Sequence, residues 1–241
     1  MSSAPVYGRR GRIGLVVPAN NSVIEPEFWS VLPPGVAAYS TRVMAKGDLT
    51  PAAVRQMEAA VDDAVAAIAA TGVDVIAYCD MVTTFIMEAG WNEHAVERIH
   101  ERTSIPALSA WTALRDALAQ IGARRIALGT PYPRAIHELA PPFFRDRGFE
   151  LSSHATLDIL AMRDVPTIDR TKLEAFVRTL DVRGCDALVL LATDLPTFTC
   201  LNDLESALGL PILSSNQTLL WRALKTLDQT PNLPLGRLFR S

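Results

Sequence analysis

A carboxylic acid and a thiol stand side by side at the end of an apolar run, and either could carry a proton. Asp80 and Cys79 follow Val75–Tyr78, a run that is typical of a buried strand. A carboxyl group at the carboxyl end of a strand is a candidate general acid or base. Two plainer roles remain open: Asp80 could only cap the next helix, and Cys79 could point into the packing of the sheet.

The surroundings of Asp80 recur later in the chain, which indicates an internal duplication. Segment 72–85 (GVDVIAYCDMVTTF) resembles segment 184–198 (GCDALVLLATDLPTF). Two further matches keep the same order and nearly the same offset: Arg12–Pro18 (RIGLVVP) with Arg125–Pro131 (RIALGTP), and Pro106–Ser109 with Pro211–Ser214. The sequence therefore predicts two similar halves of roughly a hundred residues each.

Facing strand ends of the two halves would form a cleft. Asp80 lies six residues after Asp74, and Ala192 lies six residues after the matching Asp186. Open parallel sheets bind ligands at the carboxyl ends of their strands, so these positions should face one another. The candidate catalytic residues are Asp80, Cys79 and Thr193, and the candidate substrate-binding residues are Pro18, Asn21, Met81, Val82, Thr83, Tyr132, Ala192 and Asp194.

Two of the binding candidates have alternative roles. Asn21 belongs to a polar loop at 19–22, which could clamp a carboxylate or amide at a helix start or could form an ordinary turn. Tyr132 stands in the second half where Ala19 stands in the first. Its hydroxyl could reach the same cleft, or its ring could serve only for packing.

Apolar runs that alternate with helical patterns predict an α/β fold made of two pseudo-symmetric, doubly wound parallel-sheet halves with the site in the cleft between them. The predicted strands are 12–17, 36–43, 75–78, 105–109, 125–129, 150–156, 187–191 and 210–213. Predicted helices include one from Pro51 to Ile68, with Met57 on its core face, one capped by Asn92, and one at 134–147 interrupted at Pro141–Pro142. We expect a first half at 1–109, with segment 216–241 packing back on it, and a second half at 110–215.

Composition and charge disfavour several classes of protein. The 241 residues are 49% hydrophobic with a net charge of −3, which suits a packed core and not a nucleic-acid partner. No apolar run has the length of a membrane span, and no apolar signal segment opens the sequence.

Cys79, Cys185 and Cys200 lack metal-ligand spacing, so we expect reduced thiols in a cytoplasmic protein. No nucleotide-binding glycine motif is present, so a nucleotide cofactor has no support. The cysteine spacing gives no support for a metal site either, and we predict no metal. Small apolar residues on the helices are compatible with a homo-oligomer.

The chain resembles a known family in four places. These are the duplicated halves, the loop VPANNSVIEPEF at 17–28, the TPY motif at 130–132 and the segment LPILSSNQTLLW at 210–221. Together they resemble the aspartate/glutamate racemase superfamily, most closely its maleate isomerase and arylmalonate decarboxylase branch, which includes EutA-like proteins. The resemblance implies a cofactor-free enzyme that acts on a small carboxylate as a carbon acid, with Asn21 and Tyr132 binding the carboxylate.

Both thiol positions of that family are changed here. Its racemases use two cysteines, and the resemblance places Asp80 and Ala192 at those positions, with Cys79 one residue early. Two-base thiol racemisation in its standard form is excluded unless Cys79 enters the site. Arg42 or Arg163 would supply positive charge for an anionic group.

A carboxylic acid in place of a thiol leaves two roles for Asp80. Burial could keep it protonated as a proton donor, or the substrate could be less anionic, such as an amide, imide or lactone, with Asp80 as a base. We expect a one-sided reaction, decarboxylation or isomerisation by proton transfer at carbon. Asn21, Tyr132, Thr193 and the backbone amides around 81–83 and 194 would stabilise the oxyanion. The alternatives are a hydrolase using the same cleft and a carboxylate-binding protein without catalysis.

Overall fold

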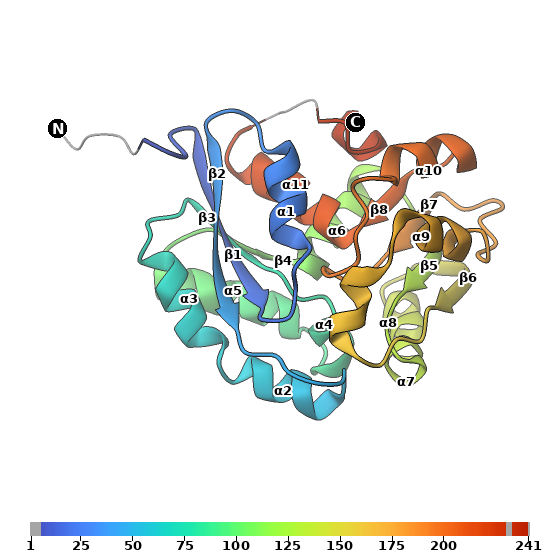
Figure 1. Cartoon of the computed structure of the whole chain (residues 1–241), viewed down its shortest axis with the longest axis horizontal. Helices are drawn as coiled ribbons and strands as arrows, with labels where there is room; N and C mark the ends of the chain where they lie inside the picture. Colours follow the sequence, from blue (N-terminus) through green and yellow to red (C-terminus); the bar gives the residue numbers. More distant parts are fainter. Residues whose placement is uncertain (1–5, 230–232, 241) are drawn as a thin grey trace.

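Two parallel four-stranded sheets form the centre of the computed structural model, which describes residues 6–229 and 233–240 (Figure 1). Their strand orders are β2-β1-β3-β4 and β6-β5-β7-β8. The strands are β1 (Gly11–Pro18), β2 (Val36–Val43), β3 (Val75–Tyr78), β4 (Ala107–Ser109), β5 (Arg125–Thr130), β6 (Glu150–Thr156), β7 (Ala187–Leu190) and β8 (Ile212–Ser214). Because each strand of the second sheet takes the place of its counterpart in the first, the predicted α/β fold with two similar halves is confirmed.

Helices cover these sheets. They are α1 (Ile24–Val31), α2 (Pro51–Glu58), α3 (Val61–Ala69), α4 (Thr83–Ile86), α5 (Trp91–Thr103), α6 (Ala110–Gln120), α7 (Arg134–His137), α8 (Ala140–Asp146), α9 (Arg170–Val177), α10 (Leu201–Leu208) and α11 (Ser215–Thr226), with 3₁₀ turns η1 (Met162–Thr167) and η2 (Arg237–Arg240). The predicted interruption at Pro141–Pro142 is confirmed, because α7 ends before these prolines and α8 begins with them in its first turn.

Two helix predictions are wrong in detail. The single helix predicted from Pro51 to Ile68 is two helices, because the chain bends at Ala59 and Ala60. The bend lets α3 pack on β1 and β2 while α2 reaches α4 at the end of β3. Asn92 does not cap α5, since Gly90 precedes the helix with a φ of 85° and the Asn92 side chain instead donates to Thr84 Oγ1 at 3.0 Å.

The matched aspartates at the starts of β3 and β7 have the same structural role. Asp74 Oδ2 accepts a hydrogen bond from the backbone N–H of Arg12, at the edge of β1, at 2.8 Å. Asp186 Oδ2 accepts from the backbone N–H groups of Arg124 and Arg125 at 2.8 Å each. Each carboxylate therefore binds the start of the neighbouring strand, which explains why the two positions match in the duplicated sequence.

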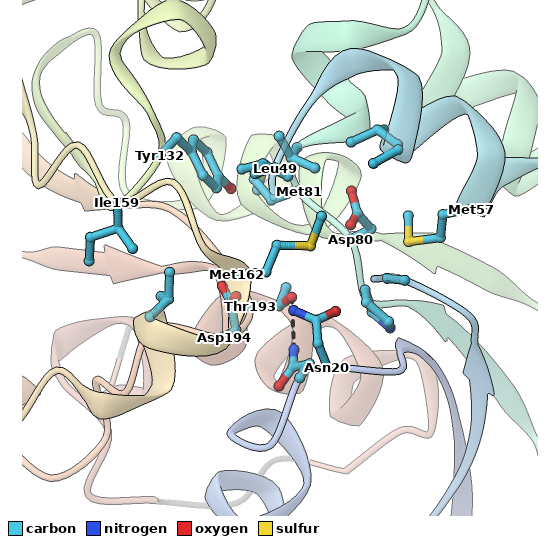
Figure 2. Close-up of a pocket in the computed structure, with 17 residues that line it drawn as sticks. Asn20, Leu49, Met57, Asp80, Met81, Tyr132, Ile159, Met162, Thr193 and Asp194 are labelled. Atoms are coloured by element: carbon cyan, nitrogen blue, oxygen red, sulfur yellow. Dashed lines mark hydrogen bonds between the residues drawn. The ribbon is translucent and has the colours of Figure 1, made fainter. Parts of the chain in front are cut away.

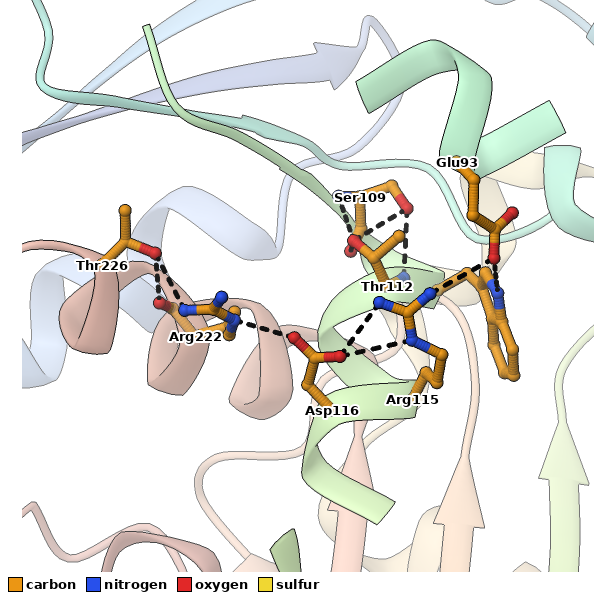
Figure 3. A network of polar contacts seen from close by, with 8 residues as sticks. Glu93, Ser109, Thr112, Arg115, Asp116, Arg222 and Thr226 are labelled. Carbon is orange, nitrogen blue, oxygen red and sulfur yellow. Dashed lines mark hydrogen bonds and ion pairs between the residues drawn. The ribbon is translucent and has the colours of Figure 1, made fainter. Parts of the chain in front are cut away.

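Equivalent capping boxes begin α6 and α11. Ser109 accepts from the backbone N–H of Thr112, and Ser214 accepts from that of Gln217. The two helices pack on one another, and Arg222 Nε of α11 donates to Asp116 Oδ2 of α6 at 2.8 Å (Figure 3). Because α11 also contacts α1, β3 and β4, it connects elements of both halves.

The segment after α11 is described for residues 233–240, while 230–232 and 241, which fall in the predicted segment 216–241, lie outside the described residues. Arg237 N donates to Glu205 Oε2 of α10 at 2.7 Å, and Gln217 Nε2 of α11 donates to Leu235 O at 2.8 Å. Among the helices described here, none is long and apolar enough to cross a membrane.

Replacement of Leu128 by Ala should destabilise the protein strongly. Leu128 lies in β5 with an exposed fraction of 0%, so its loss opens a cavity and should reduce the free energy of unfolding by roughly 2–5 kcal/mol. Leu160→Ala is the matched control, because that side chain is 52% exposed and its loss should change stability by less than about 0.5 kcal/mol. Urea unfolding measures both, and equal effects would show that β5 is not in the core.

Candidate active site

A pocket lies at the carboxyl ends of β1, β3 and β7, with walls from both halves (Figure 2). Its empty space, open mouth included, is about 590 Å³. The predicted site residues that line it are Pro18, Asn21, Asp80, Met81, Val82, Tyr132, Thr193 and Asp194. Residues from sequence positions 18 to 194 therefore meet at one site.

Three predicted site residues do not line this pocket. Cys79 points into the hydrophobic core, where its Sγ contacts Ala77 O at 3.2 Å, because adjacent residues at a strand end point to opposite sides. Thr83 is fully buried at the start of α4. Ala192 has a φ of 104°, a conformation that favours glycine, and its N–H donates to Ser215 Oγ at 3.1 Å.

Sequence reasoning missed several other lining residues. Asn20, which belongs to the predicted clamp loop but not to the candidate site residues, lines the pocket. Met57, predicted on the core face of its helix, lines it as well. Met57 is buried at 4% exposure, so the helical pattern correctly gave the buried face of α2 but could not show that this face forms a pocket wall. The remaining unpredicted lining residues are apolar: Ala45, Leu49, Ala53, Val54, Ile159, Met162 and Val165.

Loops of the two halves meet beside the pocket. Asp48 and Ala161 form an antiparallel bridge, and Leu49 N donates to Leu160 O at 3.0 Å. Leu49 and Ile159, on either side of this contact, both line the pocket. The contact therefore joins the two walls.

Asp80 both holds the first residue of α4 and lines the pocket. Its Oδ1 accepts a hydrogen bond from the Thr83 N–H at 2.8 Å, which fixes the carboxyl group at the start of α4. Only 6% of the residue is exposed, and it faces the pocket with Tyr132 and Thr193 (Figure 2). Burial raises the pKa of Asp80 above its ordinary value of 3.8, although hydrogen bonds from Thr83 and Val82 act in the opposite direction.

Two other carboxyl groups lie near Asp80. Burial, and then repulsion from Asp80, raise the pKa of Asp194 in the lining to about 7. The same two causes raise the pKa of Glu58 on α2 to about 8, and Glu58 accepts a hydrogen bond from the Tyr78 hydroxyl. No lysine, arginine or histidine of the described chain lines the pocket. The site therefore favours protonated, uncharged acids.

The two arginines expected to supply positive charge do not line the pocket. Arg42 pairs with Glu25 and donates through Nη1 to Asn21 O at 2.8 Å, so it stabilises the loop after β1. The Arg163 side chain is 88% exposed and lies beside Asp164. The expectation for both residues is therefore wrong.

Asn21 and Thr193 connect the two halves directly beside the pocket. Asn21 Nδ2 donates to Thr193 Oγ1 at 3.1 Å, and Asn21 Oδ1 accepts from the N–H groups of Val23 and Ile24. The Thr193 hydroxyl donates in turn to Cys79 O at 2.9 Å. These bonds hold three strand-end loops together, so both side chains position the site as well as line it.

Glu27 lies behind this contact. Its Oε1 accepts from the backbone N–H groups of Thr197 and Phe198 at 2.6 and 2.8 Å. Its Oε2 accepts from Asn216 Nδ2 at 2.7 Å, and Asn216 Nδ2 also donates to Thr193 O at 2.9 Å. A carboxyl group of the first half thus fixes the loop that carries Thr193. Burial raises the pKa of Glu27 to about 7, although these bonds lower it.

The fold and the pocket define a duplicated α/β protein with a pocket between its halves and a buried acid at one strand end. The chain belongs to the arylmalonate decarboxylase family, whose model matches residues 13–239.

Curated relatives cover nearly the whole chain. The maleate isomerase of Nocardia farcinica is 29% identical over 240 residues, which cover 95% of both chains. The arylmalonate decarboxylase of Bordetella bronchiseptica is 23% identical over 217 residues, which cover 88% of this chain and 89% of the relative. These relatives are enzymes, so the resemblance to this branch and the prediction of an enzyme are confirmed.

Solved structures show the same fold. A cysteine-to-serine mutant of the Nocardia farcinica maleate cis-trans isomerase, with a covalently bound succinylcysteine intermediate, superposes with a TM-score of 0.91 at 29% identity, covering 95% of this chain and 98% of that one. A double mutant of arylmalonate decarboxylase in its liganded form has a TM-score of 0.86 at 22% identity, covering 95% and 98% of the chains, and shows the fold alone.

Replacement of Glu27 by Gln should change how stability depends on pH. The Glu27 pKa is about 7 in the folded protein and near 4.5 when exposed, so the folded state holds the extra proton between these values. This group's contribution to stability is therefore largest below pH 4.5 and falls as the pH rises through 7, by an amount on the order of 3 kcal/mol. A glutamine side chain cannot ionise, so the variant should lack this loss.

Urea unfolding of both proteins between pH 4.5 and pH 8 measures the difference. The Gln variant should be less stable at low pH, because an NH2 group replaces the oxygen that accepts from Asn216 Nδ2, and its disadvantage should shrink as the pH rises. A disadvantage that grows with pH would mean that Glu27 is ionised and stabilising in the folded protein.

Proposed function

We propose that this protein catalyses proton transfer at a carbon atom next to a carboxylate, in a decarboxylation, with Asp80 as the proton donor. The main support for this proposal is the position of the Asp80 carboxyl group. It is buried in the pocket at a strand end and is held by a hydrogen bond from the Thr83 N–H. Its raised pKa favours the protonated form that a donor needs.

The proposed step balances without a cofactor. The carbon–carbon bond to one carboxylate breaks, carbon dioxide leaves, and the electron pair passes to an enediolate. Asp80 then donates its proton to the carbon and regains a proton from water. Apolar walls at Met57, Met81 and Met162 favour the loss of charge at the departing carboxylate.

Tyr132, Asn20 and Asn21 offer donors for the remaining carboxylate. Burial, then repulsion from Asp80 and Asp194, keep the pKa of Tyr132 well above its ordinary value, so its hydroxyl stays a donor. Asn20 and Asn21 offer side-chain N–H groups on the adjacent wall. We infer that these groups bind a small carboxylate without any cationic side chain.

Addition of a cysteine to the substrate is less well supported. The Nocardia farcinica maleate isomerase structure contains a succinylcysteine, but no cysteine of the described chain lines the present pocket. Burial, and then repulsion from Asp80, raise the pKa of the Cys79 thiol and disfavour its thiolate. Isomerisation in this protein would therefore proceed by a proton shift through Asp80.

A hydrolase is the second candidate function. Asp80 and Asp194 line the pocket from different halves, and a pair of carboxyl groups can activate water when one is ionised. Such an enzyme would act on a small amide, imide or lactone and would place solvent oxygen in its product.

The setting of the reaction is also part of the proposal. Cys79, Cys185 and Cys200 are free thiols, which supports a reducing cytoplasm. We infer that the enzyme needs no cofactor, since the proposed step uses only Asp80 and water. A homo-oligomer stays a prediction.

Replacement of Asp80 by Asn should abolish the reaction while the fold persists. Asn keeps an oxygen that can accept the Thr83 N–H but has no acidic proton, so turnover should fall by about 10²-fold or more. Proton NMR in deuterated buffer, with arylmalonate, methylmalonate and maleate as substrates, follows deuterium at the product carbon. Asp164→Asn, at an exposed acid, is the matched control and should keep full turnover.

Three outcomes would contradict the proposal. Turnover by Asp80→Asn at the wild-type rate would show that Asp80 is not the proton donor. Product with solvent oxygen and no deuterium at carbon would identify the hydrolase. Saturable binding of these carboxylates without turnover of any compound would identify a carboxylate-binding protein.

A further inference from the structure

Two histidines from different elements of the second half meet near the loop that carries Tyr132. His137 is the last residue of α7, and His154 lies in β6 at the edge of the second sheet. His137 Nε2 and His154 Nδ1 are 3.0 Å apart. The chain has four histidines in all, and two of them lie together here. The proposed function uses neither residue.

The spacing of the two rings suits a shared metal ion. With Zn–N bonds of about 2.0–2.1 Å, two nitrogens on one tetrahedral zinc lie about 3.3 Å apart, only a few tenths of an ångström more than in this pair. The rings do not stack, since their planes are tilted by 36° with centroids 5.2 Å apart. His154 lies on β6, the edge strand of the second sheet. A small outward movement of its side chain would admit an ion.

A carboxylate completes the group of donors. Glu138 follows His137 directly, and the ligand atoms of Glu138, His137 and His154 all lie within 4.8 Å of one another. Among the described residues, the Glu138 carboxylate has no hydrogen-bond or ion-pair partner of its own, so it is available. Two imidazoles and one carboxylate suit zinc, cobalt(II) or nickel(II), whereas calcium and magnesium prefer oxygen donors alone.

The other nitrogen of His137 is already oriented as a metal ligand requires. Thr130 Oγ1 lies 2.9 Å from His137 Nδ1. With the proton on Nδ1, His137 donates to Thr130 and presents the lone pair of Nε2 toward His154.

The geometry points to a zinc-type metal site formed by His137, His154 and Glu138, with water as the fourth ligand. The ion would join β6 to α7, the helix that directly follows the loop carrying Tyr132. This loop is already held by Thr130 at its start and by Thr156 of β6, whose hydroxyl donates to Tyr132 O. The site would therefore be structural and would stiffen the Tyr132 wall of the pocket without taking part in the reaction.

Calorimetric titration of the metal-free chain, without a histidine tag, with zinc chloride tests the site. Wild type should bind about one equivalent, and His154→Ala should weaken binding by about tenfold or more. Glu138→Gln should weaken it less, because the two imidazoles remain. His94→Ala, on α5 of the first half, is the matched control and should bind as wild type does.

Thermal unfolding supplies the second measurement. At one zinc concentration, the Tm of wild type and of His94→Ala should rise more than that of His154→Ala, because the stabilisation grows with the fraction of folded protein that binds the ion. His154→Gln replaces the Ala variant if circular dichroism shows that the latter is misfolded. The site is refuted if wild type shows no saturable binding at millimolar zinc, or if His154→Ala binds as tightly as wild type. Neither outcome bears on turnover through Asp80, so the two proposals fail separately.

Discussion

The site depends most on the hydrogen bonds that the buried carboxyl group of Glu27 accepts. This group belongs to the first half but accepts hydrogen bonds from Thr197, Phe198 and Asn216 of the second. A buried acid is costly unless its oxygens are hydrogen-bonded, so the structure has a strong reason to keep these groups together. The loop that they fix carries Thr193, whose hydroxyl then contacts the end of β3 beside Asp80. The relative placement of the halves and the shape of the pocket thus share one physical cause.

Electrostatics explains how a pocket with acidic residues can serve carboxylate chemistry. Asp80 and Asp194 both line it, no cationic side chain of the described chain does, and the walls are mainly apolar. Burial raises the pKa of each acid, and a charge on Asp80 would raise that of Asp194 further. Protonated acids donate hydrogen bonds instead of repelling an anion. Under the proposed function, Asp80 would therefore be a proton source in a pocket that disfavours charge.

The sequence predicted the strand-end site because duplication and strand patterns are local features of the chain. Asp80, Tyr132 and Thr193 each follow an apolar run, and parallel strands bring such positions together. The role of Glu27 could not be predicted, because its partners lie about 170 residues away. The contact between His137 and His154 could not be predicted for a different reason, because it depends on the register of β5 and β6. Met57 was placed on a buried face correctly, but burial against a sheet and burial against a pocket produce the same pattern.

The protonation state of Asp80 is the most direct test of this account. Carbon-13 NMR of the aspartate carboxyl groups, with the Asp80 signal assigned by its absence in Asp80→Asn, follows that state across a pH titration. The account predicts a midpoint above the ordinary value of 3.8, together with a second change in the same signal as Asp194 titrates near pH 7. A midpoint at or below the ordinary value would mean that Asp80 is ionised in the resting enzyme, which would contradict its role as the proton donor.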